Sequence, residues 1–74
     1  MANEPVAKFK DRGLELTIWE NSNDENTWYS ANMERSYKDG DDWKKTTSLN
    51  KSDLPKAAAL FQLAYAKIFE LEAQ

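Results

Sequence analysis

A single change of hydrophobic period, near residue 50, constrains the fold of this chain most strongly. Before it, apolar and polar residues alternate in short runs, which is the period-2 pattern of half-buried β-strands. After it, the segment 50–74 contains three consecutive alanines, many strong helix formers and no glycine. The sequence therefore predicts strands followed by one helix, in a single α+β domain that spans residues 1–74.

The first part of the chain is expected to form four antiparallel strands, over about residues 6–12, 14–20, 27–37 and 42–49. In the second of them, Leu14, Leu16 and Ile18 fall on one side of the strand. The dipeptide Asp39-Gly40 favours a tight hairpin, because both central positions of a type I′ turn need positive φ. These features predict an antiparallel β-meander ahead of the helix, in the order ββββα.

The helix is expected over about residues 53–72. Pro55 is tolerated only in the first helical turn, which favours Ser52 or Asp53 as the N-cap residue. Apolar residues cover more of this helix than one sheet would bury. The surplus predicts a homodimer, in which the helix contacts the same helix of a second copy. The residues expected at this dimer interface are Leu60, Phe61, Ala64 and Ile68. The alternative is a monomer with one broad apolar helix face.

The size and composition of the chain favour the dimer. A domain of 74 residues buries only about 60% of the surface that its unfolded chain exposes, so its core is small. Small domains are commonly reinforced by disulfides, a metal or a partner subunit. The chain contains neither cysteine nor histidine, so disulfides are excluded and no metal or other cofactor is expected.

The sheet face away from the helix is expected to carry aromatic and basic residues. Alternation assigns to it Lys8, Lys10, Arg12, Trp19 and Trp28. Arg35 shares its parity with core residues, and Trp43 is assigned to either core or rim. Aromatic rings stack on bases at about 1–3 kcal/mol per base, and lysines neutralise phosphates, so the pattern predicts binding of a single nucleic-acid strand. The alternative is that the tryptophans are core or rim packing and that the lysines protect an edge strand.

The junction between the fourth strand and the helix resembles a known family. Together with the order of elements, the segment DDWKKTTSLNKSDLPKAAAL (residues 41–60) resembles the positive cofactor 4 group of transcriptional coactivators and their small bacterial and phage relatives. Lys44 and Lys45 match a basic pair of the family's last strand. Arg35 matches an arginine that ends its third strand, and Trp19 matches an aromatic residue of its second. The resemblance implies a ββββα fold, dimerisation through the helix, and a DNA path along Trp19, Arg35, Lys44 and Lys45, extended by Lys8, Lys10 and Arg12.

The sequence thus predicts a single-stranded DNA-binding protein with little sequence specificity, acting in transcription, replication or recombination. The expected partners are single-stranded DNA, or RNA as its alternative, a second copy of the chain, and proteins of replication or transcription. An enzyme is not expected, because the chain has no histidine or cysteine to build an ordinary catalytic triad.

The absence of a long apolar run and of a signal-peptide core predicts a cytoplasmic protein with no membrane partner. The alternative function is a small dimeric protein-interaction module without nucleic-acid binding, which the net charge of −3 favours. A third interpretation, an acidic mimic of DNA, is weaker because this charge is small and the basic clusters oppose it.

Overall fold

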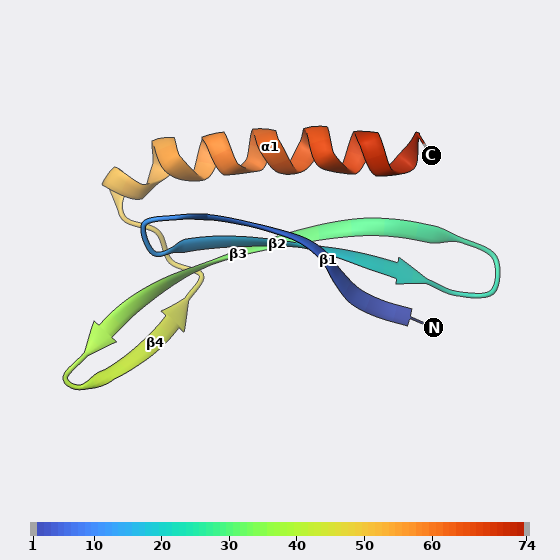
Figure 1. The fold of residues 1–74 in the computed structure, drawn as a ribbon. Coiled ribbons are helices and arrows are strands. Elements are labelled where there is room, and N and C mark those ends of the chain that lie inside the picture. Colours follow the sequence, from blue (N-terminus) through green and yellow to red (C-terminus); the bar gives the residue numbers. More distant parts are fainter. Residues whose placement is uncertain (1, 74) are drawn as a thin grey trace.

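The computed structural model describes residues 2–73 and has the predicted ββββα order (Figure 1). Its elements are β1 (Ala2–Asp11), β2 (Leu14–Ser22), β3 (Thr27–Asp39), β4 (Asp42–Thr46), a short 3-10 turn (Lys51–Asp53) and α1 (Leu54–Glu72). The strands form one antiparallel sheet in the order β1-β2-β3-β4. The predicted fold class is therefore confirmed for a single chain. Within residues 2–73, no helix has the length and apolar character needed to cross a membrane.

β1 starts earlier than expected because it contains a β-bulge. Pro5 lies opposite Trp19 of β2, whereas Ala7 lies opposite Ile18, so Val6 is the extra residue. Proline is tolerated at such a position, on an edge strand beside a bulge. The bulge interrupts the apolar–polar alternation at Val6. The residues before Val6 therefore do not continue the pattern of residues 6–12, and alternation did not include them in the strand.

β4 ends at Thr46, earlier than expected, because the chain turns away from the sheet there. The Ser48 N–H donates to Thr46 Oγ1 at 3.1 Å, and the Ser48 carbonyl accepts a hydrogen bond from Arg35 Nε at 3.0 Å. These contacts direct the chain from the sheet toward the start of α1. The expected β3–β4 hairpin is present, but its two-residue loop is Gly40-Asp41, because Asp39 pairs with Asp42 in the sheet. Gly40 has φ of 64°, whereas neither Asp39 nor Asp41 has positive φ, so the expected Asp39-Gly40 type I′ turn is not formed.

Asp53 begins α1 and ties it to the sheet. It is the N-cap residue, one of the two expected, and Pro55 lies in the first turn. Asp53 is 7% exposed. Its Oδ2 accepts a hydrogen bond from the Asn50 N–H at 2.9 Å and lies 3.5 Å from Arg35 Nε. Because Arg35 belongs to β3, this contact fixes the helix start against the sheet.

The core lies between α1 and one face of the sheet, mainly above β1 and β2 (Figure 1). Its buried apolar residues are Leu14, Leu16, Ile18, Met33, Ala57, Leu60 and Ala64. The β3–β4 hairpin projects away from the helix in Figure 1. The opposite face of the sheet is covered by no element of residues 2–73.

The helix residues expected at a dimer interface divide between two sides of α1. Leu60 and Ala64 are 5% and 3% exposed because they pack against the sheet of their own chain. Ile68 packs partly against the same core. Leu60 and Ala64 are therefore core residues of one chain, contrary to the expectation that a partner covers them. Phe61 is 47% exposed and faces outward.

Candidate nucleic-acid interface

The tryptophans all lie on the sheet face opposite α1, which we call the open face. On β2, Trp19 follows the buried Ile18 and so points to the open face. Trp28 of β3 pairs with Asn21 on the same side, and the register carries this face onto β4 at Trp43. Trp28 is 44% exposed and Trp43 is 71% exposed. Trp43, which alternation left between core and rim, is thus a surface residue of the open face.

Side-chain hydrogen bonds between β2 and β3 fix the middle of the open face. Trp19 Nε1 donates to Asn32 Oδ1 at 2.7 Å, and Asn21 Nδ2 donates to Ser30 Oγ at 3.0 Å. The indole of Trp19 is half-buried and held in one orientation by its bond to Asn32. The tryptophan rings of the open face therefore lie beside polar side chains that are hydrogen-bonded to one another or to the indole N–H. The open face thus differs from an apolar surface that only needs to be covered.

Three lysines from the two outer strands converge on Glu15 of β2. Lys10 Nζ lies 3.4 Å from Glu15 Oε2. Near the other carboxylate oxygen, Lys45 Nζ lies 3.7 Å away and Lys8 Nζ 3.9 Å away. Glu34 of β3 pairs directly opposite Glu15, and the lysines offset the repulsion between these two carboxylates. We call Glu15, Lys8, Lys10 and Lys45 the Glu15 cluster.

The lysines keep the Glu15 carboxyl group ionised. Burial acts to raise the pKa of Glu15, but the hydrogen bond from Lys10 and the positive charges of the surrounding lysines outweigh it. The pKa of Glu15 therefore lies below its ordinary value. At neutral pH the cluster combines three positive charges with one negative charge, and it gives the open face a positive centre.

Lys44 lies on the opposite side of the sheet from Lys45. Successive side chains of a strand point to opposite faces, so the basic pair cannot serve one face together. Lys44 Nζ instead lies 2.9 Å from Asp39 Oδ2, across the β3–β4 hairpin. Of the matched basic pair, only Lys45 joins the open face.

Arg35 also lies apart from the open face, and Arg12 lies in a turn outside the strands. Arg35 is on the α1 side, where it contacts the Ser48 carbonyl and Asp53, and its guanidinium lies 5.8 Å from the centre of the Tyr37 ring. Arg12 has φ of 47° in the turn between β1 and β2, outside the alternation of β1. Of the residues expected to contact DNA, the open face holds Lys8, Lys10, Trp19, Trp28 and Lys45.

Sequence reasoning assigned no role in the site to Glu15 or Asn32, and it left Trp43 between core and rim. Glu15 lies between Leu14 and Leu16, so alternation along β2 was a signal for its orientation. Its three partners come from β1 and β4, however, and their convergence depends on the register of the whole sheet.

A second exposed surface runs along α1 and is apolar. We call it the outer stripe, and it consists of Leu54, Phe61, Tyr65 and Phe69, which are 53%, 47%, 74% and 67% exposed. These positions share one side of the helix, because residues four or seven apart lie above one another. Ala58 falls between Leu54 and Phe61 on the same side.

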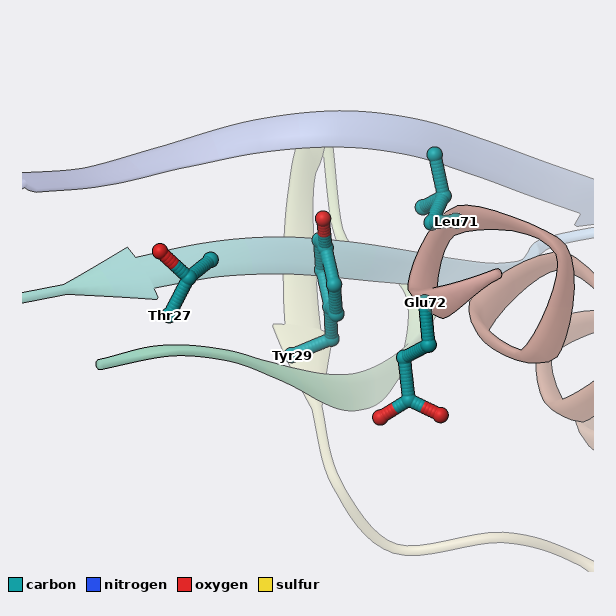
Figure 2. Close-up of a pocket in the computed structure, with 4 residues that line it drawn as sticks. All are labelled: Thr27, Tyr29, Leu71 and Glu72. Carbon is teal, nitrogen blue, oxygen red and sulfur yellow. The ribbon is translucent and has the colours of Figure 1, made fainter. Parts of the chain in front are cut away.

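Near the C-terminal end of α1, Leu71 and Glu72 line an open pocket of about 310 Å³ together with Thr27 and Tyr29 of β3 (Figure 2). Its lining offers two hydroxyl groups and one carboxylate, and it marks where the end of the helix approaches the sheet. Within residues 2–73, no three acidic, histidine or cysteine side chains are grouped to hold a metal ion.

Comparison with known proteins finds no relative: the chain matches no protein-family model, no curated protein and no solved structure. The open face and the outer stripe are therefore the features of the molecule that bear on its function.

Proposed function

We propose that the open face binds single-stranded nucleic acid, with DNA as the primary ligand and with little sequence specificity. The observation that carries this proposal is the presence of Trp19, Trp28 and Trp43 on one uncovered sheet face, together with the lysines of the Glu15 cluster. Each indole ring stacks on any base at about 1–3 kcal/mol. The lysines neutralise phosphates and release their counterions.

The length of the open face suits an extended strand. From Trp28 to Lys38, the partner of Trp43, β3 extends roughly 33 Å at about 3.3 Å per residue. Trp19 and the Glu15 cluster lie between these ends. Duplex recognition commonly inserts a helix into the major groove, whereas α1 packs its inner side into the core. A flexible single strand is therefore the better ligand for this surface.

The net charge of −3 does not oppose the proposal, because the charges are segregated. The open face carries Lys8, Lys10, Lys38 and Lys45 against Glu15 and Glu34. Many other acidic residues lie in turns or at the helix end, including Asp24, Glu25, Asp41, Glu70 and Glu72. Since charges are screened over about 8–10 Å, a bound strand responds to the local field of the face.

A tryptophan-fluorescence titration tests the proposal. The ligand is a thymidine oligomer of about 20 nucleotides, longer than the roughly 4–16 nucleotides that one single-strand-binding domain covers. We expect quenching that prefers the single strand to a matched duplex and that weakens between about 50 and 200 mM salt. No quenching at micromolar protein, with the fold intact by circular dichroism, rejects the proposal.

Lys45→Ala and Lys44→Ala form a matched pair that separates the two sheet faces. Lys45→Ala should weaken binding, because it removes a cation from the open face. Lys44→Ala should leave the affinity close to that of the wild type, because Lys44 pairs with Asp39 on the other side. Equal losses in the two variants would move the binding surface away from the open face.

The second part of the proposal is a homodimer formed through the outer stripe. Its three aromatic side chains would each bury about 150–250 Å² when covered. At their exposed fractions, and with Leu54, they leave roughly 400 Å² of apolar surface per chain. Two copies would remove roughly 800 Å² before any polar rim is counted, close to the lower limit of about 1,000 Å² for a specific interface.

An antiparallel pairing makes the outer stripe complementary to itself. With a two-fold axis beside Phe61, Leu54 faces Phe69 of the partner subunit, and the small Ala58 faces Tyr65 of the partner subunit. Large rings thus meet smaller side chains along the stripe, which favours a second copy as its occupant.

The charges at the two ends of α1 agree with the same pairing. Lys51 precedes the helix and Glu72 ends it, and neither forms an ion pair within residues 2–73. In the antiparallel register, Lys51 approaches Glu72 of the partner subunit.

Light scattering after size exclusion tests the dimer and should give about twice the 8.5 kDa of one chain. A mass of one chain at every concentration rejects the dimer.

The outer stripe also favours the alternative function, a protein-interaction module, because exposed apolar patches mark protein contacts. The proposed role in transcription, replication or recombination rests on the resemblance to the positive cofactor 4 group, to which the ββββα order adds support. The fluorescence titration separates these two functions.

A further inference from the structure

The Glu15 cluster combines exposed cations with a sheltered anion. The side chains of Lys8, Lys10 and Lys45 are 52%, 70% and 53% exposed, whereas that of Glu15 is 19% exposed. A ligand that approaches the open face therefore meets the ammonium groups before the carboxylate. One lysine would suffice to neutralise Glu15 and a second to offset Glu34 opposite it, so one positive charge remains in excess.

The three lysines are drawn together across the sheet. Lys8 and Lys10 belong to β1 and Lys45 belongs to β4, and these strands form the two edges of the sheet. Their ammonium groups repel one another, and the Glu15 carboxylate is the group that all three approach within 3.9 Å. Glu15 thus holds the three ammonium groups close together, and it also competes with any other anion for them.

We propose that the lysines of the Glu15 cluster form a phosphate-binding centre. In the free protein, Glu15 is the counter-ion of these lysines, and a backbone phosphate of the bound strand replaces it. The inference rests on the proposed function, since the phosphate belongs to the bound single strand. Lysine suits this role because its ammonium group is a compact point charge with three donors that reorient freely. Competition between Glu15 and the phosphate lowers the affinity and speeds release of the strand.

The position of the cluster supports this role. Along β2, Glu15 and Trp19 are separated by roughly 13 Å at about 3.3 Å per residue. On β4, Lys45 and Trp43 share the open face with one residue between them. A phosphate held at the cluster would therefore lie between the parts of the strand whose bases stack on Trp19 and on Trp43.

Glu15→Gln tests the inference, with Glu25→Gln as its matched control. Both variants remove one negative charge, but Glu25 lies in the exposed turn between β2 and β3. The readouts are the affinity for the thymidine oligomer and its dependence on salt. We expect Glu15→Gln to bind at least about tenfold more tightly, since one charge about 4 Å away changes an interaction by about fivefold in bulk water and by considerably more near a protein surface. Its log–log salt slope should be steeper by about 0.7, the value for one further phosphate contact. Glu25→Gln should change the affinity less than about twofold, because screening weakens distant charges.

Lys10→Gln, made in the wild type and in the Glu15→Gln background, gives a second measurement. If Glu15 occupies Lys10, the loss of affinity from Lys10→Gln is larger when Glu15 is absent. Circular dichroism of each variant shows whether it is folded. Equal losses in the two backgrounds overturn the inference.

The outcomes separate the inference from the proposed function. Binding by the wild type, with equal affinities for Glu15→Gln and Glu25→Gln, overturns the inference and leaves the proposed function intact. Absence of binding by the wild type and by Glu15→Gln overturns both. Binding by Glu15→Gln alone supports the counter-ion role, because it means that Glu15 blocks the centre.

Discussion

The open face and the outer stripe both expose aromatic rings, yet their surroundings suit different ligands. On the open face, Trp19 is hydrogen-bonded to Asn32, and lysines lie between the rings. On the outer stripe, Phe61 and Phe69 stand among leucine and alanine side chains. The first surface matches a ligand with flat bases and charged phosphates, and the second gains only by excluding water. The exposure of a ring therefore says less about its partner than the chemistry of its neighbours.

The largest expected effect separates the two sides of α1, at neighbouring positions. Leu60→Ala removes a side chain that is 5% exposed, and it should lower the free energy of unfolding by about 2–5 kcal/mol. Phe61→Ala should leave the unfolding of the isolated chain nearly unchanged and weaken the dimer instead. Urea unfolding at low protein concentration measures the first effect, and light scattering at high concentration measures the second.

A loss of stability in Phe61→Ala as large as that in Leu60→Ala would break the comparison, because it would make the outer stripe part of the core. A dimer that survives Phe61→Ala unchanged would move the interface elsewhere. In the unfolding measurement, Gln62→Ala, at the next exposed position, is the control for helix propensity, which alanine favours.

The contrast between Leu60 and Phe61 also shows what the sequence could and could not predict. The change of period near residue 50 and the alternation of β2 were sufficient for the fold, because both record which residues are buried. The broad apolar circumference of α1 correctly indicated apolar surface beyond the core. It could not show which residues face the sheet, because that depends on how the helix is rotated about its axis.

The candidate site was predicted only in part, because alternation along one strand shows which face a side chain lies on but not which strands it contacts. Trp19 and Trp28 lie on the open face as alternation indicated. Lys44 and Arg35 do not, because a match to short motifs carries no information about strand parity. The convergence of lysines on Glu15 joins β1, β2 and β4, and no local pattern records a contact between separate strands.

Trp43→Ala gives the next largest effect and sharpens the role of the open face. If a base stacks on Trp43, its loss should cost about 1–3 kcal/mol of binding free energy, or roughly 5- to 150-fold in affinity. The unfolding free energy should hardly change, because Trp43 is 71% exposed. Intrinsic fluorescence with a thymidine oligomer measures the affinity. Tyr65→Ala removes a ring of similar exposure, 74%, from the outer stripe, and it should leave the affinity for a short oligomer unchanged.

Arg35→Ala distinguishes a structural cation from a ligand-binding one. Arg35 contacts the buried Asp53 and the Ser48 carbonyl at the start of α1. Its removal leaves these groups short of a partner and should cost about 1–3 kcal/mol of stability. The affinity for the thymidine oligomer should remain within about twofold of the wild type, because Arg35 faces the α1 side and charges on the far face are screened. A large loss of affinity with unchanged stability would instead bring Arg35 into the DNA path that the family resemblance implies.

The smallest expected effect concerns the dependence of stability on pH. Because the pKa of Glu15 is lowered in the folded chain, its ionised form stabilises the fold at pH values above the ordinary glutamate pKa of about 4.3. This contribution disappears as the pH falls through the lower, folded-state pKa of Glu15. The free energy of unfolding should therefore decrease on acidification in the wild type and decrease less in Glu15→Gln, with Lys10→Gln between them. The difference at neutral pH should be about 0.2–1 kcal/mol, as for other exposed ion pairs. Urea unfolding from neutral pH to about pH 3 measures this difference. A much larger value would mean that the ion pairs of the Glu15 cluster serve mainly to stabilise the fold. The phosphate-binding role of its lysines would then lose its basis.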